Sequence, residues 1–160
     1  MEADGKVWVL NYPDIAPAFM IAEAGFDVWL GNNRGCRYSI GHVSLDTQSK
    51  EFWDFDWEEM GIYDVPAEID FILNLTGHSN LTYIGHSQGS TQMMIGLSMI
   101  PDYYDKKLNL FIALNPAIRM ANITDHMTLI AASKQDKILA RIEKHGTYNL
   151  FAPNETEQLE

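Results

Sequence analysis

The chain has 160 residues, 46% of them hydrophobic, and a formal net charge of −11 at pH 7. This length suits one globular domain and is short for two. The acidic excess argues against nucleic acid as a partner, because a phosphate backbone is bound by a cationic surface. Cys36 is the single cysteine, so these residues form neither an internal disulfide nor a zinc site built on cysteine pairs, and we predict no metal site.

The sequence has no apolar run of about twenty residues and no leader-like start. We therefore expect no transmembrane segment and no signal peptide within the chain as written. Four Asn-x-Ser/Thr triplets would accept N-glycans if the protein entered a secretory compartment. They begin at Asn74, Asn80, Asn122 and Asn154.

The first part of the chain contains helix and strand patterns that are bounded by proline, glycine and turn residues. Residues 17–24 begin with proline and are followed by Gly25, which predicts a short helix. The apolar run 26–31 predicts a buried strand that ends in the turn sequence NNRG. Residues 36–50 lack periodicity and are expected to form a long surface loop. The aromatic residues within 52–57 could form a ligand-stacking surface, but we favour packing that anchors the next helix.

The middle of the chain has the clearest pattern. A helix is predicted over 64–77, with Asp64 as its N-cap and Gly77 as its stop. Residues 81–85 read as a buried strand, 88–99 as a helix ended by Pro101, and 108–114 as another strand. The methionines of the 88–99 helix are expected to fill the core.

This order of elements predicts an α/β fold with a mostly parallel sheet and helices on both faces, because parallel neighbours need crossover connections. After about residue 117 the pattern weakens. Residues 126–146 are expected to form one or two helices outside the sheet.

Gly85-His86-Ser87-Gln88-Gly89 matches G-x-S-x-G, in which a sharp strand-to-helix turn exposes the serine hydroxyl. We expect glycine at both flanking positions because a Cβ there would collide with a neighbouring segment. The predicted strand before the motif and helix after it supply the required context. Ser87 is therefore the candidate nucleophile for an acyl carbonyl, and the Gln88 backbone N–H is the candidate oxyanion donor.

A nucleophilic serine needs a histidine base oriented by a carboxylate, in the chain order serine, acid, histidine for this type of turn. His126 and His145 are the histidines downstream of Ser87. We reject a triad with Asp136 and His145, because nine residues are too few for another crossover and the intervening sequence is helical. His86 is expected to point away from the site. The chain is thus predicted to lack the catalytic acid and histidine.

Several segments together resemble the acid lipases, the family within the α/β-hydrolase fold that includes gastric and lysosomal acid lipase. They are GFDVWLGNNRG (25–35), FWDFDWEEMGIYDVPAEIDFIL (52–73), YIGHSQGST (83–91) and FIALNPA (111–117), and YNLFAPN (148–154) is similar to a segment near the start of the family's cap. The resemblance implies hydrolysis of lipid carboxylic esters, typically triacylglycerols or steryl esters, without a cofactor. It also implies a lysosomal or secreted protein that contacts lipid surfaces transiently.

In that family a His-Gly loop with the second oxyanion donor precedes the point matching Met1, and the acid and histidine follow the cap. We therefore expect a partial α/β-hydrolase core over 1–120 and the start of a helical cap over 121–160. In that family the strand that leads into the His-Gly loop lies between the strands matching 26–31 and 81–85. Its absence would leave a gap in mid-sheet unless residues 6–11 fill it. Two alternatives stay open: another serine acyl hydrolase or acyltransferase, and a catalytically silent protein that binds lipid or a partner.

Overall fold

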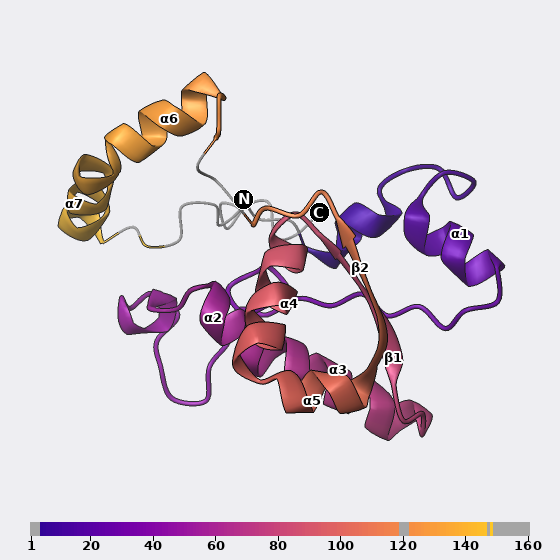
Figure 1. Cartoon of the computed structure of the whole chain (residues 1–160). Helices are drawn as coiled ribbons and strands as arrows, with labels where there is room; N and C mark the ends of the chain where they lie inside the picture. The colour runs from indigo at the N-terminus through magenta and orange to yellow at the C-terminus, as the bar shows by residue number, and fades with distance from the viewer. Residues whose placement is uncertain (1–3, 119–121, 147, 149–160) are drawn as a thin grey trace.

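The computed structural model describes residues 4–118, 122–146 and 148 (Figure 1). In chain order the elements are the 3₁₀ helix η1 (Gly5–Val9), α1 (Pro17–Glu23), the 3₁₀ helix η2 (Glu51–Trp53), α2 (Trp57–Glu59), the π-helix η3 (Met60–Asp64), α3 (Val65–Thr76), β1 (Leu81–His86), α4 (Gln88–Met99), α5 (Pro101–Lys107), β2 (Leu108–Leu114), α6 (His126–Ser133) and α7 (Gln135–His145). Among the described residues, no helix combines the length and hydropathy needed to cross a bilayer.

The sheet consists of β1 and β2, which pair in parallel and are connected by α4 and α5. The register places Tyr83 beside Phe111 and Gly85 beside Ala113. The predicted α/β class with parallel strands and flanking helices is confirmed. The predicted bounds of β1, α4 and β2 hold to within one residue, and Pro101, expected as a stop, begins the additional helix α5.

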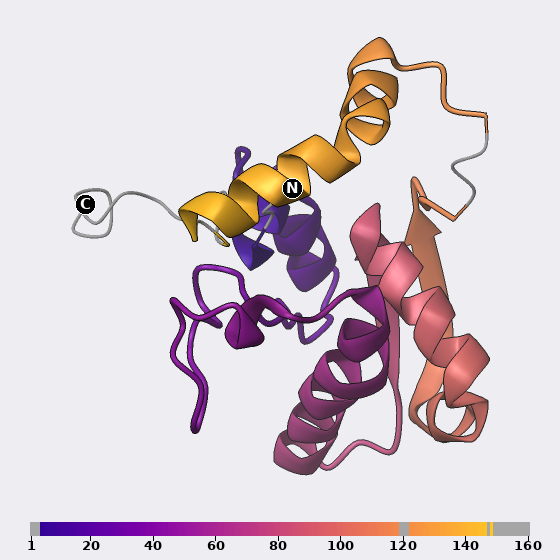
Figure 2. The same cartoon turned by 90° about the vertical axis from the view of Figure 1, so that its left-hand side faces the viewer.

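The core lies between α3, α4, α5 and one face of the sheet, and Figures 1 and 2 show these helices on the same side of the strands. Its buried members are Val65, Ile69, Leu73, Met93 and Tyr104. The apolar positions of α3 recur at the three- to four-residue spacing that aligns side chains on one helix face. Met93 fills the core, as expected of the methionines on α4, whereas Met99 is 49% exposed, so the expectation is wrong for that residue.

The opposite face of the sheet is uncovered in the described residues, so the expectation of helices on both faces is wrong there. Successive strand residues point to opposite faces, and Leu110, Ile112 and Leu114 are 52%, 36% and 41% exposed. α1 packs on η1 rather than on the strands. The two later helices, α6 and α7, extend away from the sheet (Figure 1).

Residues 26–31 form no strand, contrary to the prediction. A strand needs a neighbour to pair with its N–H and C=O groups, and in the described residues the ladder consists of β1 and β2. Residues 6–11 do not fill the gap, because Gly5–Val9 is the helix η1, capped by Asp4. The apolar run is left with Phe26 67% exposed, and Trp29 meets the ring of Phe71 edge-on at 6.1 Å.

The helix expected over 64–77 begins earlier than predicted. α2, η3 and α3 follow one another without a break from Trp57 to Thr76. The N-terminal cap is Asp56, whose side chain accepts from Glu58 N–H while the Glu59 carboxylate accepts from Asp56 N–H. Gly77 ends the helix in the left-handed region, φ +75°, as predicted.

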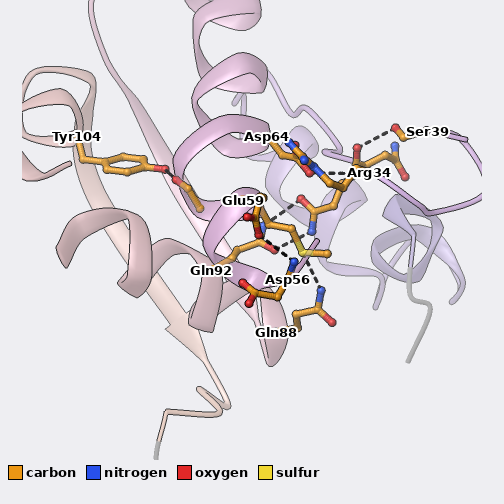
Figure 3. Close-up of polar contacts among 12 residues, drawn as sticks. Arg34, Ser39, Asp56, Glu59, Asp64, Gln88, Gln92 and Tyr104 are labelled. Atoms are coloured by element: carbon orange, nitrogen blue, oxygen red, sulfur yellow. Dashed lines mark hydrogen bonds and ion pairs between the residues drawn. The ribbon is translucent and has the colours of Figure 1, made fainter. Parts of the chain in front are cut away.

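Asp64, predicted as the N-cap, instead lies inside this helical stretch and binds Arg34. Its carboxylate accepts from the Arg34 backbone N–H at 2.9 Å and Nε at 2.8 Å (Figure 3). The guanidinium also lies over the rings of Phe55 and Tyr63. The ion pair fixes the NNRG turn against the helix.

Phe52, Trp53 and Phe55 pack as an anchor, as favoured by the sequence, whereas Trp57 is 42% exposed. Phe52 is buried and meets Trp53 edge-on, with ring centroids 5.0 Å apart. Trp53 Nε1 donates to the Thr47 carbonyl at 2.8 Å. A Cβ on Gly35 would lie 2.8–2.9 Å from the rings of Phe55 and Trp53. The cluster therefore holds the loop of residues 36–50, which has no helix or strand, against the start of α2.

Glu68 of α3 binds the NNRG turn at its first residue, Asn32. Its carboxylate accepts from Asn32 N–H at 2.8 Å, and a Cβ on Gly31 would lie 2.5 Å from Glu68 Oε2. Burial raises the pKa of this carboxyl from 4.5 to about 7, with a smaller contribution from nearby Asp64. The hydrogen bond from Asn32 opposes the shift and is outweighed.

We expect Glu68 to make the protein more stable in acid than at neutral pH. A folded-state pKa above the unfolded value means that the native state holds the extra proton, so stability is full below about pH 4.5 and falls as pH rises to about 7. The loss is about 3 kcal/mol by linkage. Glu68→Gln should therefore raise the thermal midpoint at pH 8 and change it little at pH 4.5, as measured by calorimetry.

Glu23→Gln is the matched control, since Glu23 is exposed at the end of α1. It removes the same charge without relieving burial, so its midpoint should follow that of the wild type at both pH values. Equal effects of the two substitutions at pH 8 would contradict the assignment to Glu68.

Candidate functional site

Ser87 lies at the junction between β1 and α4, where the chain reverses within one residue. Its backbone has φ +51° and ψ −113°, a combination that costs an L-residue about 1–3 kcal/mol and persists only where the surroundings impose it. Among the described residues, Asn115 is the other non-glycine with positive φ. The strand, sharp turn and helix expected around Ser87 are therefore all present.

Gly85 is required by sterics, whereas Gly89 is not. A Cβ on Gly85 would lie 2.6 Å from both C and O of Gly89 and 2.8 Å from Ser90 N, closer than atoms pack. At Gly89 the nearest atom would be the Tyr83 hydroxyl at 3.7 Å, an ordinary contact. The expectation of a collision is thus confirmed for the first glycine and wrong for the second, because only Gly85 faces the backbone of the first turn of α4.

Hydrogen bonds tie the turn to the end of β2. Ser87 N–H donates to the Leu114 carbonyl at 2.9 Å, which continues the strand pairing through the turn. Ser90 Oγ donates to the Gly85 carbonyl at 2.6 Å, and Thr91 Oγ1 donates to the Ala117 carbonyl at 2.9 Å. The position of Ser87 is thus set by both strands and by the first turn of the helix.

Gln88 is the first residue of α4, so its N–H has no acceptor within the helix. It lies at the positive end of the helix dipole, next to the Ser87 hydroxyl in sequence. Its side chain is directed elsewhere: Nε2 lies 3.2 Å from Met60 Sδ of η3 (Figure 3). The backbone N–H at this position can donate to an oxyanion that forms on an acyl carbon attacked by Ser87.

A network of side-chain hydrogen bonds, which the sequence did not indicate, connects the start of α4 to β1 and to the NNRG turn. Gln92 of α4 pairs with the side-chain amide of Asn33 and also donates to the Tyr83 hydroxyl. Tyr83 in turn donates to the Gly89 carbonyl. Asn33 and Gln92 are 59 residues apart in sequence, so no local pattern could have revealed the contact.

The remaining candidate side chains are not brought to Ser87. His86 is exposed at the end of β1. Asp136 and His145 share one helix, α7, as the sequence predicted, and Figure 1 shows α7 well separated from the N-terminal end of α4. An ion pair between Lys50 and Glu143, 2.8 Å apart, connects α7 to the loop of residues 36–50.

An open hollow of about 480 Å³ lies between α3 and the loop that follows Asn32. Arg34, Asp64 and Glu68 contribute to its lining, whereas Ser87 and Gln88 do not. The hollow therefore lies where Arg34, Asp64 and Glu68 hold the NNRG turn, and it is not part of the candidate acyl site.

Comparison with known proteins agrees with these features. A family model described as the alpha/beta hydrolase fold matches residues 7–144. The human protein named lysosomal acid lipase/cholesteryl ester hydrolase is 40% identical over 153 residues, which are 96% of this chain and 36% of that protein. Lipase 1 of Drosophila melanogaster is 44% identical over 126 residues, 79% of this chain and 28% of its own. Mouse lipase member K is 44% identical over 151 residues, 93% of this chain and 38% of its own.

The chain thus spans about a third of the length of these relatives. The resemblance to acid lipases inferred from the motifs is confirmed as a similarity along most of the chain. Because the family match covers most of the residues and the strand, turn and helix around Ser87 are present, the chain belongs to the α/β-hydrolase fold family.

Proposed function

We propose that this chain forms part of a lipid carboxylic-ester hydrolase in which Ser87 is the nucleophile. The observation that carries the proposal is the positive φ of Ser87 at a strand-to-helix junction with a sterically required Gly85 before it. The similar proteins are named lipases, and the human one is also named a cholesteryl ester hydrolase. Triacylglycerols and steryl esters are accordingly the proposed substrates.

In the proposed reaction, Ser87 Oγ gives its proton to a base and forms a bond to the acyl carbon. The former carbonyl oxygen carries the negative charge and accepts a hydrogen bond from Gln88 N–H. The alcohol then leaves with a proton, and water releases the acid from the acyl-enzyme. The chain's own contribution is a nucleophile and one donor held in fixed relation.

The proposal assigns the general base to a histidine other than His126 and His145. Two observations support this assignment: both histidines lie on helices that extend away from the sheet, and Asp136 shares α7 with His145. Likewise, residues 1–120 are proposed as part of the catalytic core and 121–160 as the start of a cap. No cofactor enters this scheme.

A lysosomal or secreted location is proposed from the names of the relatives and from the glycosylation triplets. Asn74, Asn80 and Asn122 are exposed, and Asn154 lies outside the described residues. The raised pKa of Glu68 agrees, since it favours the folded state in acid.

The second candidate is a catalytically silent protein that binds lipid or a partner chain. The uncovered sheet face with Leu110, Ile112 and Leu114 favours it, because contiguous exposed apolar surface marks interaction sites. Labelling of the serine separates the two candidates.

We expect a fluorophosphonate probe to label Ser87 slowly by itself and at least about tenfold faster with added imidazole. Imidazole supplies the missing base, takes the Ser87 proton, and lets Oγ displace fluoride at phosphorus. Mass spectrometry of the labelled peptide measures the rate. Ser87→Ala should abolish the label, and Ser98→Ala, at an exposed serine of the same helix, should not.

No Ser87 label with or without imidazole would favour the silent alternative. Rapid labelling without imidazole that is lost in His145→Ala would overturn the assignment of the base. Turnover of a short p-nitrophenyl ester by the chain alone, abolished by Ser87→Ala, would have the same meaning.

The two glycines of the motif should respond differently to alanine. Gly85→Ala forces a Cβ into the backbone of Gly89 and should destabilise the fold by about 1–3 kcal/mol or more through overpacking. A Cβ on Gly89 makes only an ordinary contact with the Tyr83 hydroxyl at 3.7 Å, and alanine favours a helix over glycine, so Gly89→Ala should not lower the free energy of unfolding. Urea unfolding measures the free energy, and imidazole-supported labelling measures the site. Equal losses in the two variants would contradict the steric argument.

A further inference from the structure

Gln92 is a polar side chain in the core. It is 3% exposed, one helical turn after Gln88 on α4. A buried amide is costly unless its hydrogen bonds are made, whereas an apolar side chain at this site would carry no such cost. The hydrogen bonds of the Gln92 amide must therefore offset the cost of burying it.

All the hydrogen-bonding groups of the Gln92 amide that point into the fold have partners. Oε1 accepts from Asn33 Nδ2 at 2.6 Å, and Nε2 donates to Asn33 Oδ1 and to the Tyr83 hydroxyl, both at 3.1 Å. Figure 3 shows this side chain directed toward the turn that carries Arg34. One side chain thus joins α4, β1 and the NNRG turn.

The bond to Tyr83 leads directly to the candidate site. The Tyr83 hydroxyl uses its proton to donate to the Gly89 carbonyl at 3.1 Å, and Gly89 follows Gln88 in the first turn of α4. Burial raises the pKa of the Tyr83 phenol, so the hydroxyl stays a donor. The Tyr83 ring is held by Phe111 of the neighbouring strand, with ring centroids 5.9 Å apart.

The backbone of Gln92 is fixed as well. Gly61 of η3 approaches the Gln92 carbonyl so closely that a Cβ there would clash with it. On the next turn, a Cβ on Gly96 would lie 2.6 Å from the Gly61 carbonyl. α4 therefore has no room to slide at Gln92, and displacement of its first turn is resisted from this point.

We propose that Gln92 is a positioning residue for the Ser87 site, holding the first turn of α4 to the NNRG turn through Asn33 and to β1 through Tyr83. The consequence for reactivity rests on the proposed function, whereas the hold on the first turn does not. Reactive geometry tolerates little displacement. A loosened first turn moves the Gln88 N–H away from the place where the oxyanion forms.

The test compares Gln92→Leu and Tyr83→Phe with the wild-type chain. Tyr83→Phe keeps the ring and removes only the hydroxyl that links Gln92 to Gly89, so it remains informative if Gln92→Leu does not fold. The matched control is Thr82→Val, which removes a 2.8 Å side-chain hydrogen bond to Asn109 on the exposed side of the same strands.

The first measurement is amide hydrogen exchange by NMR. Ser90 and Thr91 N–H donate to the Ser87 carbonyl at 3.0 and 3.3 Å and report on the first turn of α4. Both variants should speed their exchange by about three- to tenfold, the factor for one net hydrogen bond. Amides of β2 and of the end of α4 should not change, nor should any amide in Thr82→Val.

The second measurement is imidazole-supported labelling of Ser87, normalised to folded protein. We expect both variants to label about three- to tenfold more slowly. A uniform rise in exchange across the fold, with unchanged labelling, would overturn the proposal and leave Gln92 a purely structural residue. If the wild type does not label at all, the proposed function fails, and local exchange at Ser90 and Thr91 still decides the role of Gln92.

Discussion

The close approach of Gly85 to the first turn of α4 is the constraint on which the candidate site depends. With no Cβ at Gly85, the end of β1 lies directly against the backbone of Gly89. The chain must then reverse at Ser87, and only a positive φ accomplishes this within one residue. The bond from Ser87 N–H to Leu114 extends the strand pairing to the turn. The backbone conformation of Ser87 is therefore maintained by the parallel sheet.

The helices stabilise this arrangement from one side. Tyr104 of α5 is fully buried and donates to the Gly61 carbonyl, while Gly61 itself lies against α4. A π-helical turn at η3 brings this carbonyl inward, and such turns are often found near functional sites. The core, the glycine contact and the Gln92 amide all act on α4. The site is thus a property of how one helix is held, more than of any single side chain in the turn.

The sequence predicted elements that are locally encoded and missed those that depend on distant partners. The bounds of β1, α4 and β2 followed from apolar runs separated by the turn at Gly85–Ser87 and by Pro101, and from the NPA sequence after β2. Residues 26–31 have the same composition as a strand, but a strand exists only with a neighbour, which local sequence does not specify. Asp64 resembled a cap because a proline follows it closely. The capping box of Asp56 and Glu59 was visible upstream and was the better signal.

Buried and paired carboxylates connect the NNRG turn to the helices. Glu68 and Asp64 both act on the NNRG turn, the first through Asn32 and the second through Arg34. Asn33, between them, carries the amide that pairs with Gln92. In acid, the Glu68 carboxyl is neutral, so burying it costs little free energy and the turn is at its most stable. As the pH rises through about 7 the same carboxyl becomes charged in a buried place, and the support of α4 through Asn33 then depends on a less stable turn. The protonation of one buried carboxyl is thus connected, through Asn32 and Asn33, to the support of α4.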